Sequence, residues 1–295
     1  MTSPPPRVIV LDFDGTMTDA EAEGAPFREG YLADLATLAG VARDEPRFAA
    51  IVAEVEGHLA SAPEAHPFRW KGKAVAPASV DPYLRMVPIA DAIFDAFGLF
   101  EDRVVRGRLT GGVLYKHNYQ LTMGRPVFRE GAAAVLRALA GTETFVVTNS
   151  HTRAVADKID MLDRAAGGGV AWLGARVHGD AQKFEIDDAW DAVPTSLPIP
   201  GLVAREVLLR RRCYHDRLAT LLAGAGASWA DLVVIGDIFE LDLALPLAMG
   251  ARVGLVVSPH TPRYEIDFVA AQPRARVLLG LPAILDFVGV AAASA

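Results

Sequence analysis

Short apolar runs that end in polar turns are the feature of this 295-residue sequence that most constrains its fold. Residues 7–13 form such a run, rich in β-branched side chains, and the shape recurs at 145–147, 232–235, 253–257 and 277–279. A continuous apolar run between turn residues is typical of a strand buried on both faces, as in a parallel sheet. Segments of helical spacing separate the runs. This alternation predicts an α/β domain with a doubly wound parallel sheet.

Residues 17–125 follow a different pattern. Apolar positions keep helical spacing over 27–38 and 48–59, and Asp81-Pro82 is a helix-start signal ahead of an apolar stretch at 89–97. No comparable β-type run appears before 110–114. We therefore expect a mostly α-helical domain at 17–125, inserted into a sheet domain made of residues 1–16 and 126–295.

Glycines and prolines between 167 and 200 interrupt the regular alternation of the sheet domain. A triple glycine at 167–169 marks a turn, and Pro194, Pro198 and Pro200 follow among short apolar runs. We expect an elaboration on the sheet domain there, with a small β element.

Composition narrows the functional class. The chain is 52% hydrophobic and 22% charged, as expected of a folded globular protein. Its net charge of −7, with no basic run longer than 210–212, argues against a nucleic-acid partner. Cys213 is the single cysteine, which excludes an intrachain disulfide or a CxxC metal site and fits a reducing compartment.

The two ends of the sequence carry no targeting or membrane signal that we recognise. Residues 1–7 lack the basic and apolar parts of a signal peptide. The apolar end, 277–295, contains Pro282 and Asp286, so we expect a buried strand and a terminal helix there. A cytoplasmic protein without a membrane partner is the expectation; the sequence leaves its oligomeric state open.

Two acids follow the first predicted strand, in Asp12-Phe13-Asp14-Gly15-Thr16. Their carboxylates can both reach the space beyond the strand end, and Gly15 permits a sharp exit. Paired acids repel each other unless they share a proton or a cation, and oxygen ligands suit Mg²⁺. The alternative is an Asp-x-Asp-Gly turn that only ends the strand.

A second acidic pair, Asp237 and Asp242, follows the apolar run at 232–235. In open parallel sheets the chemistry lies at the carboxyl ends of the strands, so the two pairs predict a shared cation site. For Asp242 the alternative is an acid in the first turn of a helix, favoured by the helix dipole.

A third polar turn, Thr148-Asn149-Ser150, follows the run at 145–147. A hydroxyl and backbone N–H groups at a strand-to-helix turn can hold an anionic oxygen. Simple capping of the following helix is the alternative.

Together these three motifs, in this order and strand context, resemble motifs I, II and IV of the haloacid dehalogenase-like (HAD) superfamily. The resemblance covers the sheet domain, and the helical insert resembles the C1-type cap of that family. It implies a Rossmann-like core, a Mg²⁺ cofactor and a small phosphorylated substrate, and says little about which one.

The resemblance also implies roles for single residues. Asp12 would be the nucleophile and Asp14 the general acid and base. Asp12, the Asp14 carbonyl and Asp237 would hold Mg²⁺, with Asp242 supporting the metal or its waters. Thr148, Asn149 and a basic side chain would bind the phosphoryl oxygens.

The basic residue, motif III of the family, is where the sequence departs from the pattern. Lys183 has a suitable context after Gly179-Asp180 but lies unusually far upstream of Asp237. Arg212 has the more usual spacing. Local context favours Lys183 as the basic residue, which requires an insertion between Lys183 and Asp237. Arg212 remains the open alternative.

Several alternatives remain open from the sequence. A dehalogenase would not need the acid at Asp14, whereas a phosphonatase needs a cap lysine, for which Lys71, Lys73 and Lys116 are available. A phosphomutase or a non-catalytic scaffold on the same fold are the others. The basic and aromatic cluster at 66–73 could receive a leaving group, although an ordinary loop is the plainer interpretation; His117, Tyr119 and His151 offer weaker cases.

Overall fold

The computed structural model describes residues 6–291 and divides them into two compact units. Unit 1 contains residues 6–19, 69–76 and 128–291, and unit 2 contains 20–68 and 77–127. The chain thus passes between the units at 19/20, 68/69, 76/77 and 127/128. Residues 69–76, which lie within the expected insert at 17–125, group with the sheet. The absence of a signal peptide and the end of the terminal helix were expected partly from residues 1–5 and 292–295, which lie outside the described residues.

Unit 1 is built on a six-stranded sheet with the strand order β10-β9-β8-β1-β4-β5, in which every neighbouring pair is parallel. The doubly wound α/β class expected from the sequence is therefore confirmed. The strands are β1 (Val8–Leu11), β4 (Thr144–Val147), β5 (Val177–His178), β8 (Leu232–Gly236), β9 (Arg252–Val256) and β10 (Ala275–Leu278).

Strand β1 lies inside the sheet, between β4 and β8. Val10 pairs with Phe145 on one side and with Val234 on the other, and all four residues of β1 are buried. This two-sided burial explains why the strand reads as an unbroken apolar run. Because the three strands are parallel neighbours, their carboxyl ends meet at one edge of the sheet.

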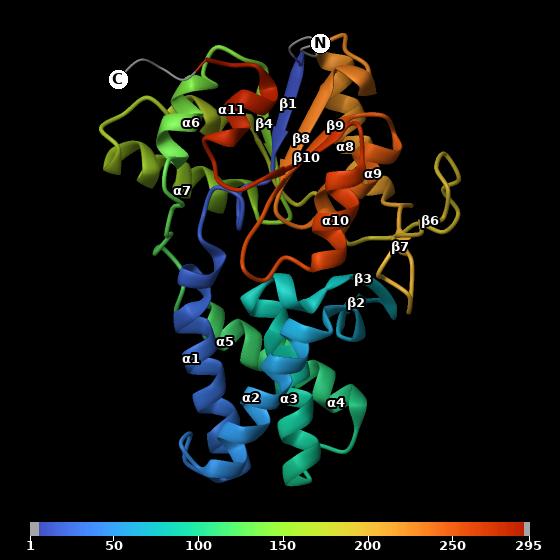
Figure 1. The fold of residues 1–295 in the computed structure, drawn as a ribbon. Helices are drawn as coiled ribbons and strands as arrows, with labels where there is room; N and C mark the ends of the chain where they lie inside the picture. Colours follow the sequence, from blue (N-terminus) through green and yellow to red (C-terminus); the bar gives the residue numbers. More distant parts are fainter. Residues whose placement is uncertain (1–5, 292–295) are drawn as a thin grey trace. The chain divides into compact units, whose positions relative to one another are not determined.

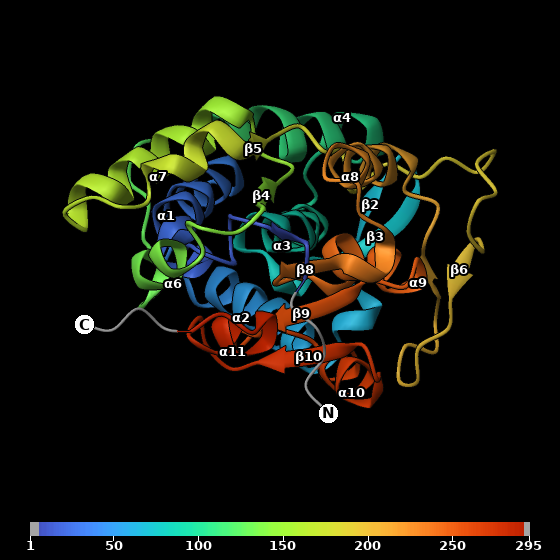
Figure 2. The ribbon, with the colours of Figure 1, turned by 90° about the horizontal axis from the view of Figure 1, so that it is seen from above.

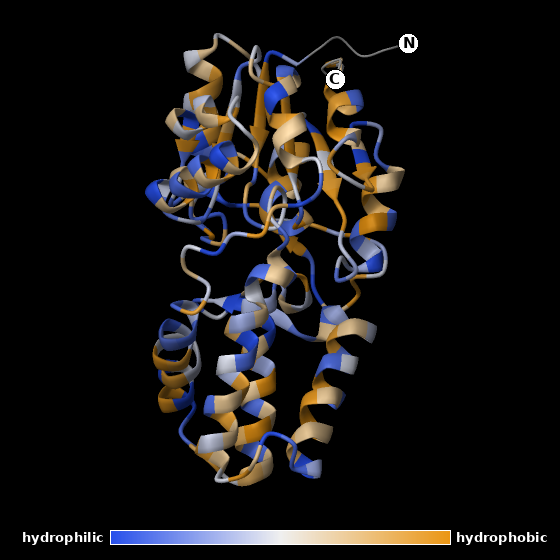
Figure 3. Cartoon of the chain, turned by 90° about the vertical axis from the view of Figure 1, so that its left-hand side faces the viewer, coloured by the Kyte–Doolittle hydropathy of each residue, from blue (hydrophilic) through white to orange (hydrophobic). Residues whose placement is uncertain are grey.

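Helices cover both faces of this sheet (Figures 1 and 2). One face packs against α6, α7 and α11, and the other against α8, α9 and α10. Figure 3 shows the apolar strands between more polar outer helix surfaces. The helices are α6 (Ala132–Ala138), α7 (Thr152–Ala165), α8 (Arg212–Gly224), α9 (Ala244–Ala248), α10 (Arg263–Ala271) and α11 (Ala283–Val288).

The region from 167 to 211 adds short elements to unit 1. The 3-10 helix η4 (Ala171–Arg176) leads into β5, and a two-stranded antiparallel sheet pairs β6 (Ser196–Leu197) with β7 (Val207–Leu208). A small β element therefore occurs in this region, but its second strand lies beyond Pro200. Both views place β6 apart from the main sheet (Figures 1 and 2).

Unit 2 is mostly helical and has its own apolar core. Helices α1 and α3 pack together in it through residues such as Phe27, Tyr31, Ile89 and Phe94. Asp81 caps α3 by accepting the N–H of Tyr83 at 2.7 Å, and Gly98 ends the helix in the left-handed conformation. The helices are α1 (Ala20–Ala39), α2 (Pro46–Ser61), α3 (Pro82–Phe97), α4 (Arg103–Arg108) and α5 (Tyr115–Tyr119).

Two local features differ from the sequence patterns. Residues 110–114, compared above with a strand, lie in a π-helical segment, η3 (Leu109–Leu114), where the Thr110 hydroxyl donates back to the Arg106 carbonyl at 3.0 Å. The cluster at 66–73 falls largely in a hairpin of β2 (Pro67–Trp70) and β3 (Lys73–Pro77). Lys71 and Gly72 at its turn have φ of 47° and 80°, as a two-residue hairpin turn requires.

The described part of the chain, residues 6–291, contains no helix that combines the length and the apolar character needed to cross a membrane.

Candidate active site

Three carboxylates from two adjacent strand ends form the centre of the site. Asp12 follows β1, Asp237 follows β8, and Asp242 lies on the short π-helical segment η6 (Phe239–Leu243). One oxygen of each lies within 4.8 Å of the others. Asp12 and Asp242 are buried, while Asp237 is partly exposed. Sequence positions more than two hundred residues apart are thus brought to one point by the parallel register of β1 and β8.

Lys183 is the cation that touches this cluster. Its Nζ lies 2.6 Å from Asp12 Oδ1 and 2.7 Å from Asp242 Oδ1, and its side chain is 1% exposed. The ammonium also lies 5.4 Å from the centre of the Tyr214 ring, whose hydroxyl donates to the Asp242 carbonyl at 2.9 Å. The structure therefore brings Lys183 to the acids in a fully buried ion-pair network.

An irregular turn after β5 delivers Lys183 to this place. Asp180 and Gln182 adopt left-handed φ values of 52° and 50°, which reverse the chain within a few residues. The Lys183 N–H then donates to Asn149 Oδ1 at 2.8 Å. Asn149, a predicted substrate-binding residue, is thus engaged with the backbone of Lys183.

Gly179 permits this turn to approach the neighbouring loop. A Cβ there would lie 2.2 Å from the Thr152 backbone nitrogen, where no side chain fits. The Ala181 N–H donates to the Thr148 carbonyl at 3.0 Å. The Thr148 hydroxyl accepts the Ser150 N–H at 3.2 Å, and Thr148 is 2% exposed.

Arg212 lies elsewhere. Its side chain is 57% exposed and forms ion pairs with Asp187 and Asp216 at 3.4 and 3.6 Å. The structure therefore does not bring Arg212 to the carboxylate cluster, and of the two basic residues left open by the sequence only Lys183 contacts it.

The wide spacing between Lys183 and Asp237 comes from the inserted segment with β6 and β7. Arg205 of this segment holds Glu240 with two hydrogen bonds of 2.6 Å, and the Tyr264 hydroxyl donates to the same carboxylate at 3.1 Å. Glu240 is fully buried two residues before Asp242. The insertion is therefore anchored directly beside the second acidic pair.

Glycines let the acidic loops approach each other. Gly15 has a φ of +84°, and a Cβ at this position would lie 2.3 Å from Asp237 Oδ2. A Cβ at Gly236 would lie 2.5 Å from the Asp242 Cβ. Thr16 adds a hydroxyl that donates to Asp237 Oδ1 at 3.1 Å. Gly15 and Gly236 have no room for a side chain, because the side chains of Asp237 and Asp242 occupy the space.

Asp14 points to a different set of partners. Its carboxylate accepts the Ser150 hydroxyl and the Lys158 ammonium, each at 2.6 Å. Lys158 lies on α7 and is not among the residues that the sequence motifs indicate. The only sequence signal for it is a lysine on the helix that follows the third polar turn.

Burial and mutual repulsion perturb the acids of the cluster. Burial raises the pKa of Asp12 from 3.8 to about 7; Lys183 opposes the rise, while Asp242 adds to it. Burial, and then Asp12 and Asp242, raise the pKa of Asp237 well above its ordinary value. For Lys183, burial lowers the pKa, but Asp12 and Asp242 outweigh it and the net direction is upward. Lys183 is therefore charged at neutral pH.

The donor set fits a divalent cation. Three carboxylates against one contacting ammonium leave excess negative charge in a buried place, which is costly without a counter-ion. All of the candidate ligand atoms are carboxylate oxygens, as hard cations such as Mg²⁺ prefer. Asp12, Asp237 and Asp242 are the residues that would hold it.

The metal-free protein should become less stable as the pH rises. The Asp12 carboxyl has a pKa of about 7 in the folded protein and near 3.8 in the unfolded chain, so it holds its proton more tightly when the protein is folded. The folded state is therefore favoured most below pH 4, and this advantage disappears as the pH rises to 7. We expect the free energy of unfolding in EDTA to fall by about 2–3 kcal/mol between pH 5 and pH 8.

Urea unfolding at several pH values measures this. Asp12→Asn, which removes the titrating group, should show a flatter profile than the wild type. Equal pH dependence in both proteins would contradict the assignment of the effect to Asp12.

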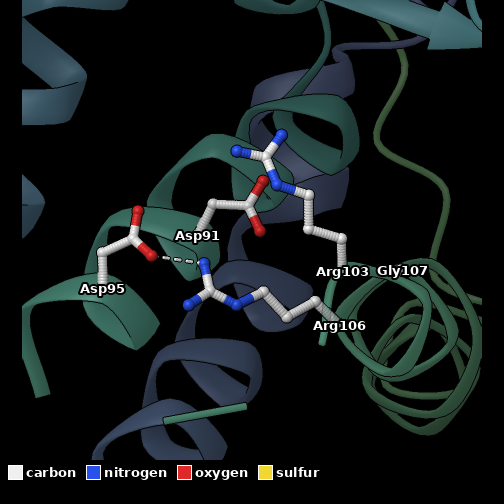
Figure 4. Close-up of a pocket in the computed structure, with 5 residues that line it drawn as sticks. All are labelled: Asp91, Asp95, Arg103, Arg106 and Gly107. Carbon is white, nitrogen blue, oxygen red and sulfur yellow. Dashed lines mark hydrogen bonds and ion pairs between the residues drawn. The ribbon is translucent and has the colours of Figure 1, made fainter. Parts of the chain in front are cut away.

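Unit 2 has a charged hollow of about 220 Å³ between α3 and α4, lined by Asp91, Asp95, Arg103, Arg106 and Gly107 (Figure 4). Arg106 is engaged with Asp95 and with the carbonyls of Leu99 and Phe100. The charges of two acids and two guanidinium groups balance one another, so we interpret the lining of the hollow as a structural ion-pair cluster.

The weaker candidates of the sequence analysis have ordinary surroundings. His117 is exposed, and Tyr119 stacks on Tyr115 with 5.6 Å between ring centres. His151 is exposed and lies 2.7 Å from Asp180.

Comparisons with known proteins concern the fold. No family model matches the sequence, and no curated protein is significantly similar to it in sequence. The structure is similar to that of a predicted phosphoglycolate phosphatase from Haemophilus somnus, with a TM-score of 0.53 and 13% identity over 97% of this chain and 99% of that one.

Two further structures have the same degree of similarity. The putative HAD hydrolase YfnB from Bacillus subtilis, described as bound to magnesium, has a TM-score of 0.52 and 13% identity over 97% of this chain and 100% of that one. A haloacid dehalogenase-like hydrolase from Streptococcus pneumoniae has a TM-score of 0.52 and 13% identity over 96% of this chain and 98% of that one. The resemblance drawn from the three polar turns is thereby confirmed for the fold: this chain has the fold of the haloacid dehalogenase-like hydrolases.

Proposed function

We propose that the protein is a Mg²⁺-dependent phosphatase that hydrolyses a small phosphorylated metabolite through an aspartyl-phosphate on Asp12. The observation that carries the proposal is the Lys183 ammonium between Asp12 and Asp242, with Asp237 within 4.8 Å of both. Four residues from three separate chain segments gather there, in a buried place where charge interactions are strong. The fold, shared with a predicted phosphatase and with a protein described as bound to magnesium, adds support.

In this proposal Asp12 attacks phosphorus, and the leaving oxygen departs with a proton from Asp14. Asp14 then takes a proton from the water that hydrolyses the aspartyl-phosphate. Ser150 and Lys158, which bind its two oxygens, keep its carboxylate in a defined orientation.

Lys183 and Thr148 have the task of holding the phosphoryl oxygens. Lys183 is fixed by two carboxylates and by the Asn149 side chain, so little reorganisation is needed when charge develops. Bound at Asp12, Asp237, Asp242 and the Asp14 carbonyl, Mg²⁺ would supply positive charge that lets an anionic nucleophile approach an anionic phosphate.

Two of the alternatives, a dehalogenase and a phosphonatase that uses Lys71 or Lys73, fit these residues less well. A dehalogenase has no use for a positioned acid at Asp14. The lysines at 71 and 73, which a phosphonatase could use to form a Schiff base, form ion pairs with Glu185 and Asp188. The contacts of these residues therefore favour phosphate-ester hydrolysis.

Hydrolysis of p-nitrophenyl phosphate tests the proposal. Purified wild-type protein should be active with Mg²⁺, lose this activity in EDTA and regain it when Mg²⁺ is restored. Arg212→Ala changes an exposed residue that pairs with Asp187 and Asp216, so it serves as the matched control and should keep wild-type activity. Mg²⁺ binding in calorimetry without hydrolysis of this ester or of a panel of phosphorylated metabolites would contradict phosphatase chemistry.

A further inference from the structure

Arg211 is the largest fully buried side chain of the described residues. Its guanidinium donates to three backbone carbonyls: Lys183 at 2.5 Å, Val75 at 2.8 Å and Leu208 at 3.1 Å. Within residues 6–291, no carboxylate forms an ion pair with it. The side chain thus joins the residue that contacts the acid cluster to a hairpin strand about a hundred positions earlier.

The hairpin at 69–76 rests on the segment that directly follows Lys183. The Trp70 ring lies against Phe184, with 4.7 Å between ring centres, and its Nε1 donates to Glu185 at 2.8 Å. Lys71 forms an ion pair with Glu185 at 2.8 Å, and Lys73 forms one with Asp188. Three members of the basic and aromatic cluster noted in the sequence, Trp70, Lys71 and Lys73, therefore contact residues 184–188 through their side chains.

These contacts make the hairpin and Lys183 mutually dependent. A buried guanidinium is tolerated only while carbonyls accept its N–H groups. If the hairpin moves away, Val75 no longer accepts, and Arg211 must reorient to find another partner. Since the same planar group also holds the Lys183 carbonyl, its reorientation disturbs the backbone that carries the ammonium to Asp12 and Asp242.

We propose that Arg211 is a positioning residue that couples docking of the 69–76 hairpin to the placement of Lys183. The hairpin thereby controls how well the site holds phosphoryl oxygens. Only this last consequence rests on the proposed function; the coupling itself is a property of the fold.

The test loosens the hairpin from its exposed side with Lys71→Ala/Lys73→Ala, which leaves the core untouched. Exposed ion pairs are individually weak, so we expect amide hydrogen exchange in 69–76 to become about three- to tenfold faster. Coupling predicts a rise of similar size in 180–183, a segment that makes no direct contact with the two lysines, in the full-length metal-free protein. Lys116→Ala, an exposed lysine in unit 2, is the matched control and should change neither segment.

A hairpin that exchanges faster while 180–183 keeps its wild-type rate would overturn the proposal. This readout requires no activity, so it is independent of whether the protein is a phosphatase. A second variant, Arg211→Lys, keeps the charge but loses the planar fork. In that background, the hairpin change should still accelerate exchange in 69–76 and should no longer accelerate it further in 180–183. Persistence of the joint response would show that Arg211 is not the link.

If the phosphatase proposal holds, inhibition by orthophosphate gives a third readout. The Lys71→Ala/Lys73→Ala variant should need about threefold or more orthophosphate for half-inhibition, with a smaller change in kcat. Unchanged inhibition would remove the functional part of the proposal and leave the exchange result to decide the coupling.

Discussion

Asp12→Asn is expected to abolish phosphatase activity, with a loss of at least ~10³-fold in kcat. The amide is not a nucleophile toward phosphorus, and the change also removes one anionic ligand from the proposed metal site. Asparagine has nearly the same shape as aspartate, and its amide oxygen can still accept a hydrogen bond from the Lys183 ammonium, which lies 2.6 Å from Asp12 Oδ1. Steady-state hydrolysis of p-nitrophenyl phosphate with Mg²⁺ measures the loss.

The same substitution should stabilise the metal-free protein above neutral pH. Burial raises the pKa of Asp12 to about 7, so its ionised form works against folding in the absence of a cation. A gain in thermal stability together with loss of activity separates a chemical role from a folding defect. Retention of more than about one hundredth of wild-type kcat would exclude Asp12 as the nucleophile.

Lys183→Met should impair both stability and activity. The ammonium is 1% exposed and holds Asp12 and Asp242, so its removal leaves buried carboxylates without their ion-pair partner. Breaking a buried pair in this way costs about 3–5 kcal/mol. The cost should be largest at pH 8 without metal and smaller at pH 5, where the acids can take up protons. With Mg²⁺, kcat should fall by about 10²–10³-fold, since a fixed charge beside the phosphoryl oxygens is lost.

Arg212→Met is the matched control for this prediction. It removes a positive charge of the other basic residue that the sequence left open, but from a side chain that is 57% exposed. Its effect on the free energy of unfolding should stay within about 0.5 kcal/mol. Equal effects of the two substitutions, measured by urea unfolding at pH 5 and pH 8, would contradict the assigned difference between Lys183 and Arg212.

Parts of this arrangement could be predicted because they follow from local pattern. The buried strands before Asp12 and Asp237 are continuous apolar runs, and the parallel order of β1 and β8 places their ends together. The fold class could therefore be inferred from the sequence, and the position of the acids at one sheet edge came with it.

Other parts depend on tertiary contacts that no local pattern encodes. Strand β5 has only two residues, and the turn after it relies on left-handed Asp180 and Gln182, which are not glycines. The spacing to Asp237 could not decide between Lys183 and Arg212, because the inserted segment with β6 and β7 lengthens the chain between Lys183 and Asp237. Lys158 was missed because a lysine on an amphipathic helix is ordinarily a solvated charge, and its partner Asp14 lies more than a hundred positions away.

The grouping of residues 69–76 with unit 1 has a consequence for exchanging the helical unit between proteins of this fold. A graft that replaces 20–127 as one block would also discard the hairpin, although the hairpin belongs to the recipient. Arg211 would then lose the Val75 carbonyl as its acceptor. Phe184 would lose its ring contact with Trp70, and Glu185 its ion pair with Lys71. A chimera that retains 69–76 and joins the donor helices at four junctions preserves these contacts, so two donor segments, and not one, are the unit of exchange.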